Sequence, residues 1–387
     1  MGLRNLHRQP RIFYANRNTT TAGTTVNLLE ENPVSAPQQT LFHTWSKTEY
    51  VIFVLVGLYA FCAWLITQLY DRPEAFHGLL YAPVSGKILL LCFLPYVLLR
   101  ILWIMVWRHP VHLTRTILQD FHHTFLHPQR LMHGVPLFFL FMVFFGAFTG
   151  MKDMIPVLNP YSWDQTFATL DAMLHGGIHP WRLLHKVVAY PPVTSAINIS
   201  YNLWLVVLIV VFFWQALTLH LPRIRLQFLL SFFLSWIIIG HVLATFFSSA
   251  GPCYYAAVTG TQETPYDALM TYLQETNEIY PVWALKTQEM LWQSYTEKKL
   301  IMGSGISAMP SMHVTIAFLM VLVAWHWGGT YAFFLTSYFI IILVGSVHLA
   351  WHYAVDAYVA IPLTYGIWRL SGFVVRCLDP SPVQQKT

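Results

Sequence analysis

Charged residues are scarce in this sequence. Asp, Glu, Lys and Arg make up only 10% of its 387 residues, whereas a soluble domain usually carries about 25%. The four cysteines lie far apart and indicate no disulfide framework. The net charge of +5 is scattered rather than gathered in a basic stripe, which excludes nucleic-acid binding. No internal repeat is found, which argues against transporter folds built from repeats. The chain is instead 56% hydrophobic and 16% aromatic, and we predict an integral membrane protein.

Long apolar stretches recur along the chain. A bilayer core of about 30 Å requires roughly 20 apolar residues per helix. None of the stretches alternates as the strands of a membrane barrel do, so we predict an all-α fold with about eight transmembrane helices. They cover residues 50–70, 87–107, 134–149, 200–219, 227–248, 311–327, 331–350 and 354–376.

The distribution of charge predicts the orientation. Eight spans place both termini on one side, together with the loops 108–133 and 220–226. The segments on that side carry more Lys and Arg than acids, and the opposite segments carry more acids. By the positive-inside rule, we expect cytoplasmic termini and extracytoplasmic loops 150–199 and 249–310. We favour a bacterial inner membrane.

The composition also divides the chain into segments. Residues 1–45 are polar, which predicts a disordered tail. Residues 46–133 end with an amphipathic stretch over 111–127 that suits an interfacial helix. The predicted segments are a cytoplasmic tail (1–45), two extra transmembrane helices with the interfacial helix (46–133), a core (134–376) and a second cytoplasmic tail (377–387).

Polar residues gather in three segments that this topology places at the outer face: 247–255, 303–313 and 346–356. Polar groups at membrane depth commonly mark functional sites. From the first segment we nominate Gly251, Cys253 and Tyr254 for substrate binding.

The second segment has the composition of a phosphate-binding loop. Pro310 is suited to a first helical turn, where free N–H groups and the Ser311 hydroxyl would face an anion at the positive end of the helix. His313, just inside the helix, could pass a proton to a leaving oxygen. The plain alternative is a Gly/Ser/Pro loop with an interfacial histidine, and on these residues alone that alternative is favoured.

The third segment contains His352 and, one helical turn later, Asp356. A carboxylate that accepts one ring N–H fixes the tautomer and orients the other nitrogen as nucleophile or base. One alternative is a structural pair at a helix end. Another is a metal site with His348, but a turn separates the two histidines and zinc requires further ligands. We therefore predict no metal and no cofactor.

Together these residues resemble a known family. Pro310-Ser311-x-His313 and His352-x-x-x-Asp356 resemble the second and third signature motifs of the phosphatidic acid phosphatase type 2 superfamily. Residues 249–255 and 345–356 are similar to its inositol phosphorylceramide synthase-like branch, which has bacterial members. The resemblance covers about residues 160–375 and implies a six-helix core.

The resemblance implies roles for these residues. His352 would be the nucleophile that forms a phosphohistidine, Asp356 would orient it, and His313 would act as general acid and then as base. Ser311 and nearby N–H groups would hold phosphate oxygens. The sequence departs from the pattern because the first motif, Lys-x6-Arg-Pro, is missing and Ser346 replaces the arginine before the nucleophile. Candidates for the missing positive charge are Lys186, Arg182, Lys298, Lys299 and His348.

We therefore expect a metal-independent lipid phosphotransferase that moves a phosphoryl headgroup from a membrane phospholipid or lipid phosphate to a hydroxyl acceptor. A phosphatase that uses water is the alternative, and a non-catalytic transporter of lipid or polyprenyl phosphate is a further one. Two amphipathic stretches, Asp267–Glu278 and Val282–Tyr295, predict helices that could cover the site and exclude water. An interfacial belt is the simpler interpretation of that loop.

Overall fold

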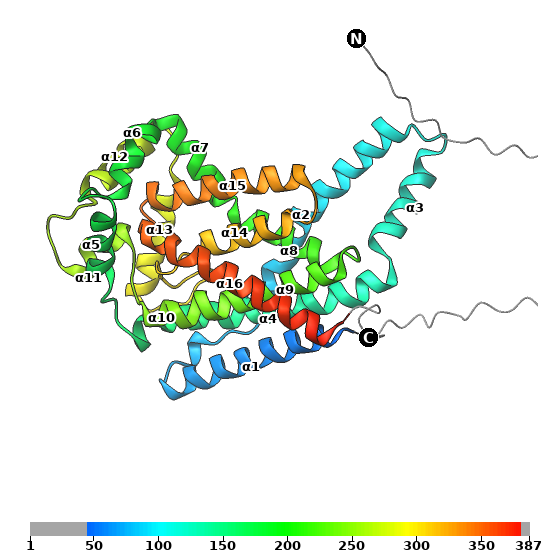
Figure 1. Cartoon of the computed structure of the whole chain (residues 1–387), viewed down its shortest axis with the longest axis horizontal. Helices are drawn as coiled ribbons and strands as arrows, with labels where there is room; N and C mark the ends of the chain where they lie inside the picture. The colour runs from blue at the N-terminus through cyan, green and yellow to red at the C-terminus, as the bar shows by residue number, and fades with distance from the viewer. Residues whose placement is uncertain (1–44, 381–387) are drawn as a thin grey trace, which may run out of the picture. The chain divides into compact units, whose positions relative to one another are not determined.

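The structure is a computed structural model that describes residues 45–380. The predicted tails lie outside this range, apart from their innermost residues. Every regular element within it is a helix and no strand is present there (Figure 1), which confirms the all-α prediction.

Eight of the described helices form the body of the molecule. They are α1 (Lys47–Leu69), α2 (Ala82–Trp103), α4 (Pro128–Leu158), α8 (Trp204–Leu217), α9 (Pro222–Ile237), α14 (Met312–Ala324), α15 (Gly329–His348) and α16 (Ala354–Leu378). The other described helices connect them. These are η1 (Pro73–Ala75), η2 (Ile104–Arg108), α3 (Leu113–Phe125), α5 (Asp164–Leu174), α6 (Pro180–Val188), α7 (Pro191–Asn202), η3 (Ile238–Leu243), α10 (Ala244–Phe246), η4 (Pro252–Tyr254), α11 (Tyr255–Thr259), α12 (Asp267–Ile279) and α13 (Trp283–Thr296).

Six helices in the described range are long and apolar enough to cross a membrane, so the chain is an integral membrane protein. They are Lys47–Leu69, Pro128–Leu158, Pro191–Leu217, Pro222–Phe246, Gly329–His348 and Ala354–Leu378. Eight spans were expected. The stretch 87–107 belongs to α2, which is not among the six, and the stretch 311–327 forms the short helix α14.

Other helices surround the short helix α14. It has 13 residues and is about 20 Å long. It packs against α8, α9, α15 and α16, and Val314, Ile316 and Leu319 are fully buried. An apolar run cannot by itself distinguish a lipid-facing helix from one at the centre of a bundle.

Helix α4 differs most from the prediction of a short span over 134–149. It continues for 31 residues, through Lys152 and Asp153, to Leu158. The prediction placed these two residues in the loop that follows the span, but both are partly buried in the helix.

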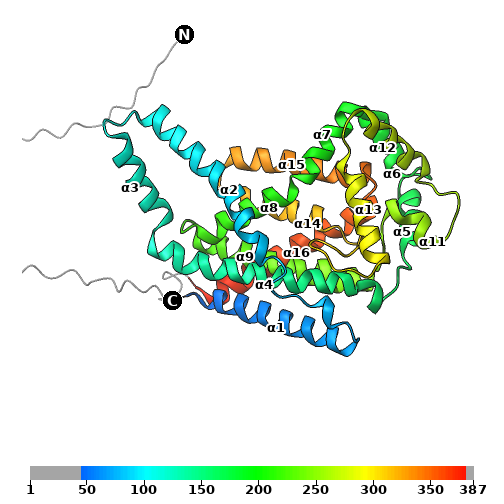
Figure 2. The same ribbon diagram turned by 180° about the vertical axis from the view of Figure 1, so that it is seen from behind.

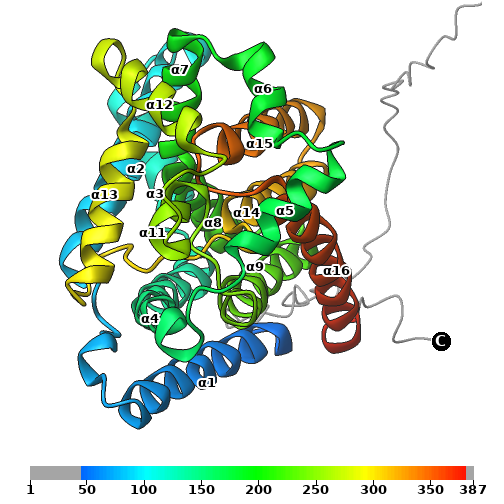
Figure 3. The same cartoon turned by 90° about the vertical axis from the view of Figure 1, so that its left-hand side faces the viewer.

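The two long loops form a cap of short helices at one end of the bundle. Helices α5, α6, α11, α12 and α13 gather there, while α3 lies at the other end (Figures 1 and 2). Helices α12 and α13 agree closely with the predicted amphipathic stretches. Viewed from that end, the cap covers the ends of α14, α15 and α16 (Figure 3).

Polar contacts attach α1 to the bundle at the opposite end. The buried Glu49 carboxylate accepts from the guanidinium of Arg225 on α9 (3.0 Å) and lies 2.8 Å from His133 Nδ1 on α4. Asp379, after α16, accepts from the backbone N–H and the hydroxyl of Thr48. These groups hold α1 against α4, α9 and α16.

The sidedness of the cap is a prediction that labelling checks. Burial raises the pKa of the Cys253 thiol, so its reactive thiolate is scarce. We therefore choose Glu263→Cys, at an exposed position between α11 and α12, in a chain whose native cysteines are serine. An impermeant maleimide added to intact cells should label this variant. A matched chain that retains only the exposed Cys377 should react only after permeabilisation. Labelling of Cys377 in intact cells would reverse the predicted orientation.

Candidate active site

The three polar segments meet beneath the cap. The N–H of Cys253 donates to the carbonyl oxygen of Ala350 (3.0 Å), and the N–H of Ala308 donates to that of Ser249 (2.9 Å). Gly251 has φ +101°, and a Cβ there would lie 2.6 Å from the carbonyl oxygen of Trp351. Only glycine allows this approach. Backbone contacts therefore bind the three segments into one cluster.

His352 and Asp356 form a buried pair within this cluster. Nδ1 of His352 lies 3.0 Å from Asp356 Oδ2 and 2.9 Å from the carbonyl oxygen of Ala308. Because both neighbours are acceptors, Nδ1 carries the proton and donates it. In the neutral ring Nε2 then has a free lone pair and can act as a nucleophile.

The Asp356 carboxylate is completely buried in the first turn of α16. Oδ2 also accepts from the backbone N–H of Tyr353 (3.2 Å), while Oδ1 has no partner among the described residues. The imidazole of His352 is therefore the side chain with which this carboxylate interacts.

His313 faces the same space from α14. Its ring is stacked with Tyr201, at a centroid distance of 4.6 Å, and contacts Trp204 at 4.4 Å. Its centroid lies 5.7 Å from that of His352. The aromatic contacts hold the ring toward His352, where it can exchange a proton with a group bound between the two histidines.

A cavity of about 400 Å³ opens at these histidines. Its polar lining includes Tyr81, Lys152, Ser304, Ser307, His313 and His352, and Lys152 is the last residue of α4 to line it. The rest is mainly aromatic and aliphatic, and is lined by residues that include Phe138, Phe141, Phe145, Phe148, Ile209 and Phe213. The lining follows α4 from Lys152 to Phe138, a rise of about 21 Å. The cavity thus joins a polar head to a long apolar extension.

Lys152 is the only Lys or Arg among the described residues that line this cavity. Gly305, at φ +87°, lies directly on it, because a Cβ at that glycine would be 2.8 Å from Lys152 Cγ. The backbone of the glycine loop therefore holds the lysine side chain against the cavity. Sequence reasoning did not nominate Lys152.

The nominated cations lie elsewhere. Arg182 and Lys186 are exposed on α6, and Lys298 and Lys299 are exposed after α13. His348 is fully buried but is turned away from the cavity, with Nε2 2.9 Å from Thr194 Oγ1 and its ring 5.0 Å from that of His185. None of the five lines the cavity.

A signal for Lys152 was present in the sequence. The missing first motif survives in part as Lys152-x6-Asn159-Pro160. Asn159, in place of the arginine, donates to the carbonyl oxygens of Thr245 (2.8 Å) and Phe246 (3.2 Å), so it has a structural role. Because Asn159 replaces the arginine, the sequence does not match the full first motif, and Lys152 does not stand out.

The other nominated binding residues separate into two groups. Pro310 and Tyr254 line the cavity, although Pro310 precedes the helix instead of lying in its first turn. Gly251 and Cys253 do not line it and instead connect the loops. Ser311 is buried, and its hydroxyl oxygen accepts from the Val314 N–H (3.4 Å) as a helix cap. The N–H groups of Met312 and His313, the first two of α14, have no partner within the helix, and an anion could accept from them.

Two buried acids on α5 support the cluster and were also missed. Asp164 accepts from the N–H groups of Ala250 (2.9 Å) and Gly251 (2.8 Å) and from the Tyr353 hydroxyl. Asp171 accepts from the first N–H groups of α16, those of Ala354 and Val355. Burial raises the pKa of both carboxyls, against the effect of these hydrogen bonds.

Asp164 and Asp171 are seven positions apart, so a helix places both on one face. This spacing is the signal in the sequence for the pair. Because the first N–H groups of α16 donate to Asp171, they are not free to bind an anion in the cavity. The groups left for an anion are the first N–H groups of α14 and Lys152.

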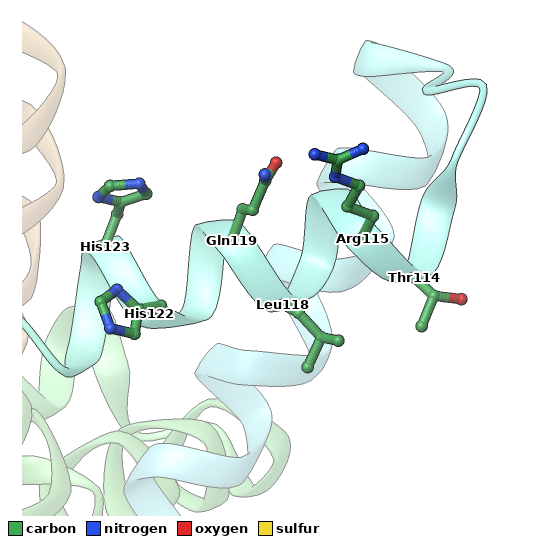
Figure 4. A pocket seen from close by; sticks show the side chains of 6 residues that line it. All are labelled: Thr114, Arg115, Leu118, Gln119, His122 and His123. Atoms are coloured by element: carbon green, nitrogen blue, oxygen red, sulfur yellow. The ribbon is translucent and has the colours of Figure 1, made fainter.

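A separate hollow lies on α3. Its lining residues, Thr114, Arg115, Leu118, Gln119, His122 and His123, all come from this one helix and project into open space (Figure 4). Since no second element closes over it, we assign it no function. Among the described residues, no three His, Cys, Asp or Glu side chains converge as a metal site would require.

The geometry agrees with a comparison to known families. The model of the PAP2 superfamily matches residues 165–370, more than half of the chain. The chain belongs to the PAP2 superfamily. PAP2 membership implies activity of the lipid-phosphate phosphatase or phosphotransferase type. The matched range contains His313, His352 and Asp356, whereas α1, α2 and α4, with Lys152, precede it. No curated protein and no solved structure matches the chain.

The position of Lys152 generates a prediction for PAP2-type activity. Lys152→Met should lower kcat/KM for a lipid phosphate by about 10²- to 10³-fold, the usual effect of removing one charge-stabilising group. Lys186→Met is the matched control, and its activity should stay close to that of the wild type. Release or transfer of the phosphoryl group by purified protein measures both. Wild-type activity in Lys152→Met, or a large loss in Lys186→Met, would contradict this assignment.

Proposed function

We propose that the protein transfers the phosphoryl headgroup of a membrane lipid to an organic hydroxyl through a phosphohistidine on His352. The observation that carries the proposal is the pair of acceptors at His352 Nδ1, which leaves Nε2 for a cavity that His313 and Lys152 also line. A nucleophile, a proton carrier and a cation around one cavity are the groups that phosphoryl transfer through a covalent intermediate requires.

The reaction has two balanced halves. In the first, His352 Nε2 forms a bond to phosphorus, the bond from phosphorus to the lipid oxygen breaks, and His313 gives its proton to that oxygen. Asp356 stabilises the positive charge of the substituted imidazole and stays ionised. In the second, an acceptor hydroxyl returns a proton to His313, its oxygen bonds to phosphorus, and His352 is released.

Phosphoryl transfer depends mainly on positioning and charge. Lys152 and the first N–H groups of α14 are the groups that would neutralise the phosphoryl oxygens. Lys152 thus occupies the position of the lysine in the first motif, while Asn159 and Ser346 stand where the usual motifs have arginines.

The apolar extension of the cavity indicates the class of donor. Rings on α4, α8 and α9 line it from the histidines inward. A hydrocarbon chain can lie there while the phosphate occupies the polar end, which favours a phosphate ester with a long apolar tail.

Helix α13 favours transfer over hydrolysis. The Gln288 side chain donates to the carbonyl oxygen of Leu349 (2.9 Å), and the Tyr254 hydroxyl donates to that of Gln288 (2.9 Å). The rings of Tyr254 and Trp292 stack at 5.3 Å. These contacts hold α13 over the cluster, where it limits the entry of water. The resemblance to inositol phosphorylceramide synthases points the same way, and charge distribution favours the outer face as the location.

The product distribution tests the proposal. Purified protein would receive a phosphate-labelled phospholipid with ceramide, diacylglycerol, an inositol lipid or a glycan as acceptor. We expect at least one acceptor to receive more label than water does. Gln288→Ala should loosen α13 and shift label toward hydrolysis, whereas Gln293→Ala, an exposed change on the same helix, should not. Dominant release of free phosphate or free phosphorylated headgroup with every acceptor would identify a phosphatase.

A further inference from the structure

The segment between α1 and α2 packs tightly on α4, although it lies outside the range that matches the family. A Cβ at Gly146 would be 2.5 Å from the carbonyl oxygen of His77, and one at Gly150 would overlap that of Ala75. Two glycines on one face of α4 therefore allow backbone-to-backbone contact. This contact sets the position of the residues that follow, up to Tyr81.

Tyr81 lines the polar end of the cavity together with Lys152. Its hydroxyl lies 2.8 Å from Thr149 Oγ1 on α4 and accepts from the N–H of Gly303 (3.2 Å). The phenol therefore joins α4 to the glycine loop. Two residues later in that loop, Gly305 lies on Lys152.

We propose that Tyr81 is a positioning residue for Lys152, acting through the glycine loop, so that the part of the chain preceding the family-matched range completes the active site. The proposal rests on the proposed function only for its kinetic consequence. The physical reason is that Gly303 and Gly305 both have positive φ. Glycine adopts many backbone conformations, so a further contact is needed to hold the loop in this one. The hydroxyl of Tyr81 supplies a fixed contact, and the loop then keeps Lys152 directed at the phosphoryl site.

The test begins with Tyr81→Phe, which keeps the ring and removes both hydrogen bonds. We expect kcat to fall about tenfold with little change in KM, because Lys152 acts on charge that develops in the transition state. In a Lys152→Met background the same change should have almost no further effect. A residue with a merely structural role would lower activity additively in both backgrounds. Tyr280→Phe, an exposed tyrosine on the cap, is the matched control.

A second readout does not need activity. Amide hydrogen exchange at residues 301–307 should be faster in Tyr81→Phe than in the wild type and unchanged in Tyr280→Phe. Gly150→Ala should reproduce this effect by displacing the Ala75 carbonyl, whereas Gly57→Ala, where a Cβ meets nothing within 4 Å, should not. Wild-type exchange in Tyr81→Phe, or an additive loss of kcat with Lys152→Met, overturns the proposal. If the protein proves to lack phosphotransfer but the exchange result holds, the proposed function fails while the positioning contact stands.

Discussion

One imidazole proton connects the fold to the chemistry of this protein. Nδ1 of His352 donates toward both the carbonyl oxygen of Ala308 and the Asp356 carboxylate. The first contact fixes the loop before α14, and the second fixes the first turn of α16. The same proton sets the tautomer, so the arrangement that joins these loops also exposes Nε2 to the cavity.

The surrounding structure maintains this arrangement with buried polar groups rather than with apolar packing alone. From a single short helix, Asp164 satisfies backbone N–H groups of the 249–255 loop and Asp171 satisfies those of the first turn of α16. Unsatisfied amides at this depth would be costly, so each carboxylate stabilises one loop conformation over its alternatives. The apolar extension lies on the other side of the histidines. The protein therefore separates a rigid polar head from a space suited to a hydrocarbon chain.

Much of the fold and part of the site were predictable from sequence. The membrane class follows from composition, and the segments containing His313 and His352 lie together as expected. The span 134–149 was drawn too short because Gly134 and Gly150 look like helix ends in the sequence, whereas in α4 they allow close packing against Leu217 and Ala75. The same limitation applies to α14, whose apolar sequence does not reveal that other helices enclose it. His348 was nominated from its neighbours in sequence, but at the end of α15 it packs against Thr194 and His185, away from the cavity.

Trapping the covalent intermediate is the most direct test of the central claim, that His352 is the phosphorylated nucleophile. The wild-type protein would be mixed briefly with a lipid phosphate labelled on phosphorus, denatured in alkali, and digested. The account predicts label that is stable to alkali, lost in mild acid, located on the peptide that contains His352, and absent from His352→Ala. Label on another residue, or full turnover by His352→Ala, would contradict it.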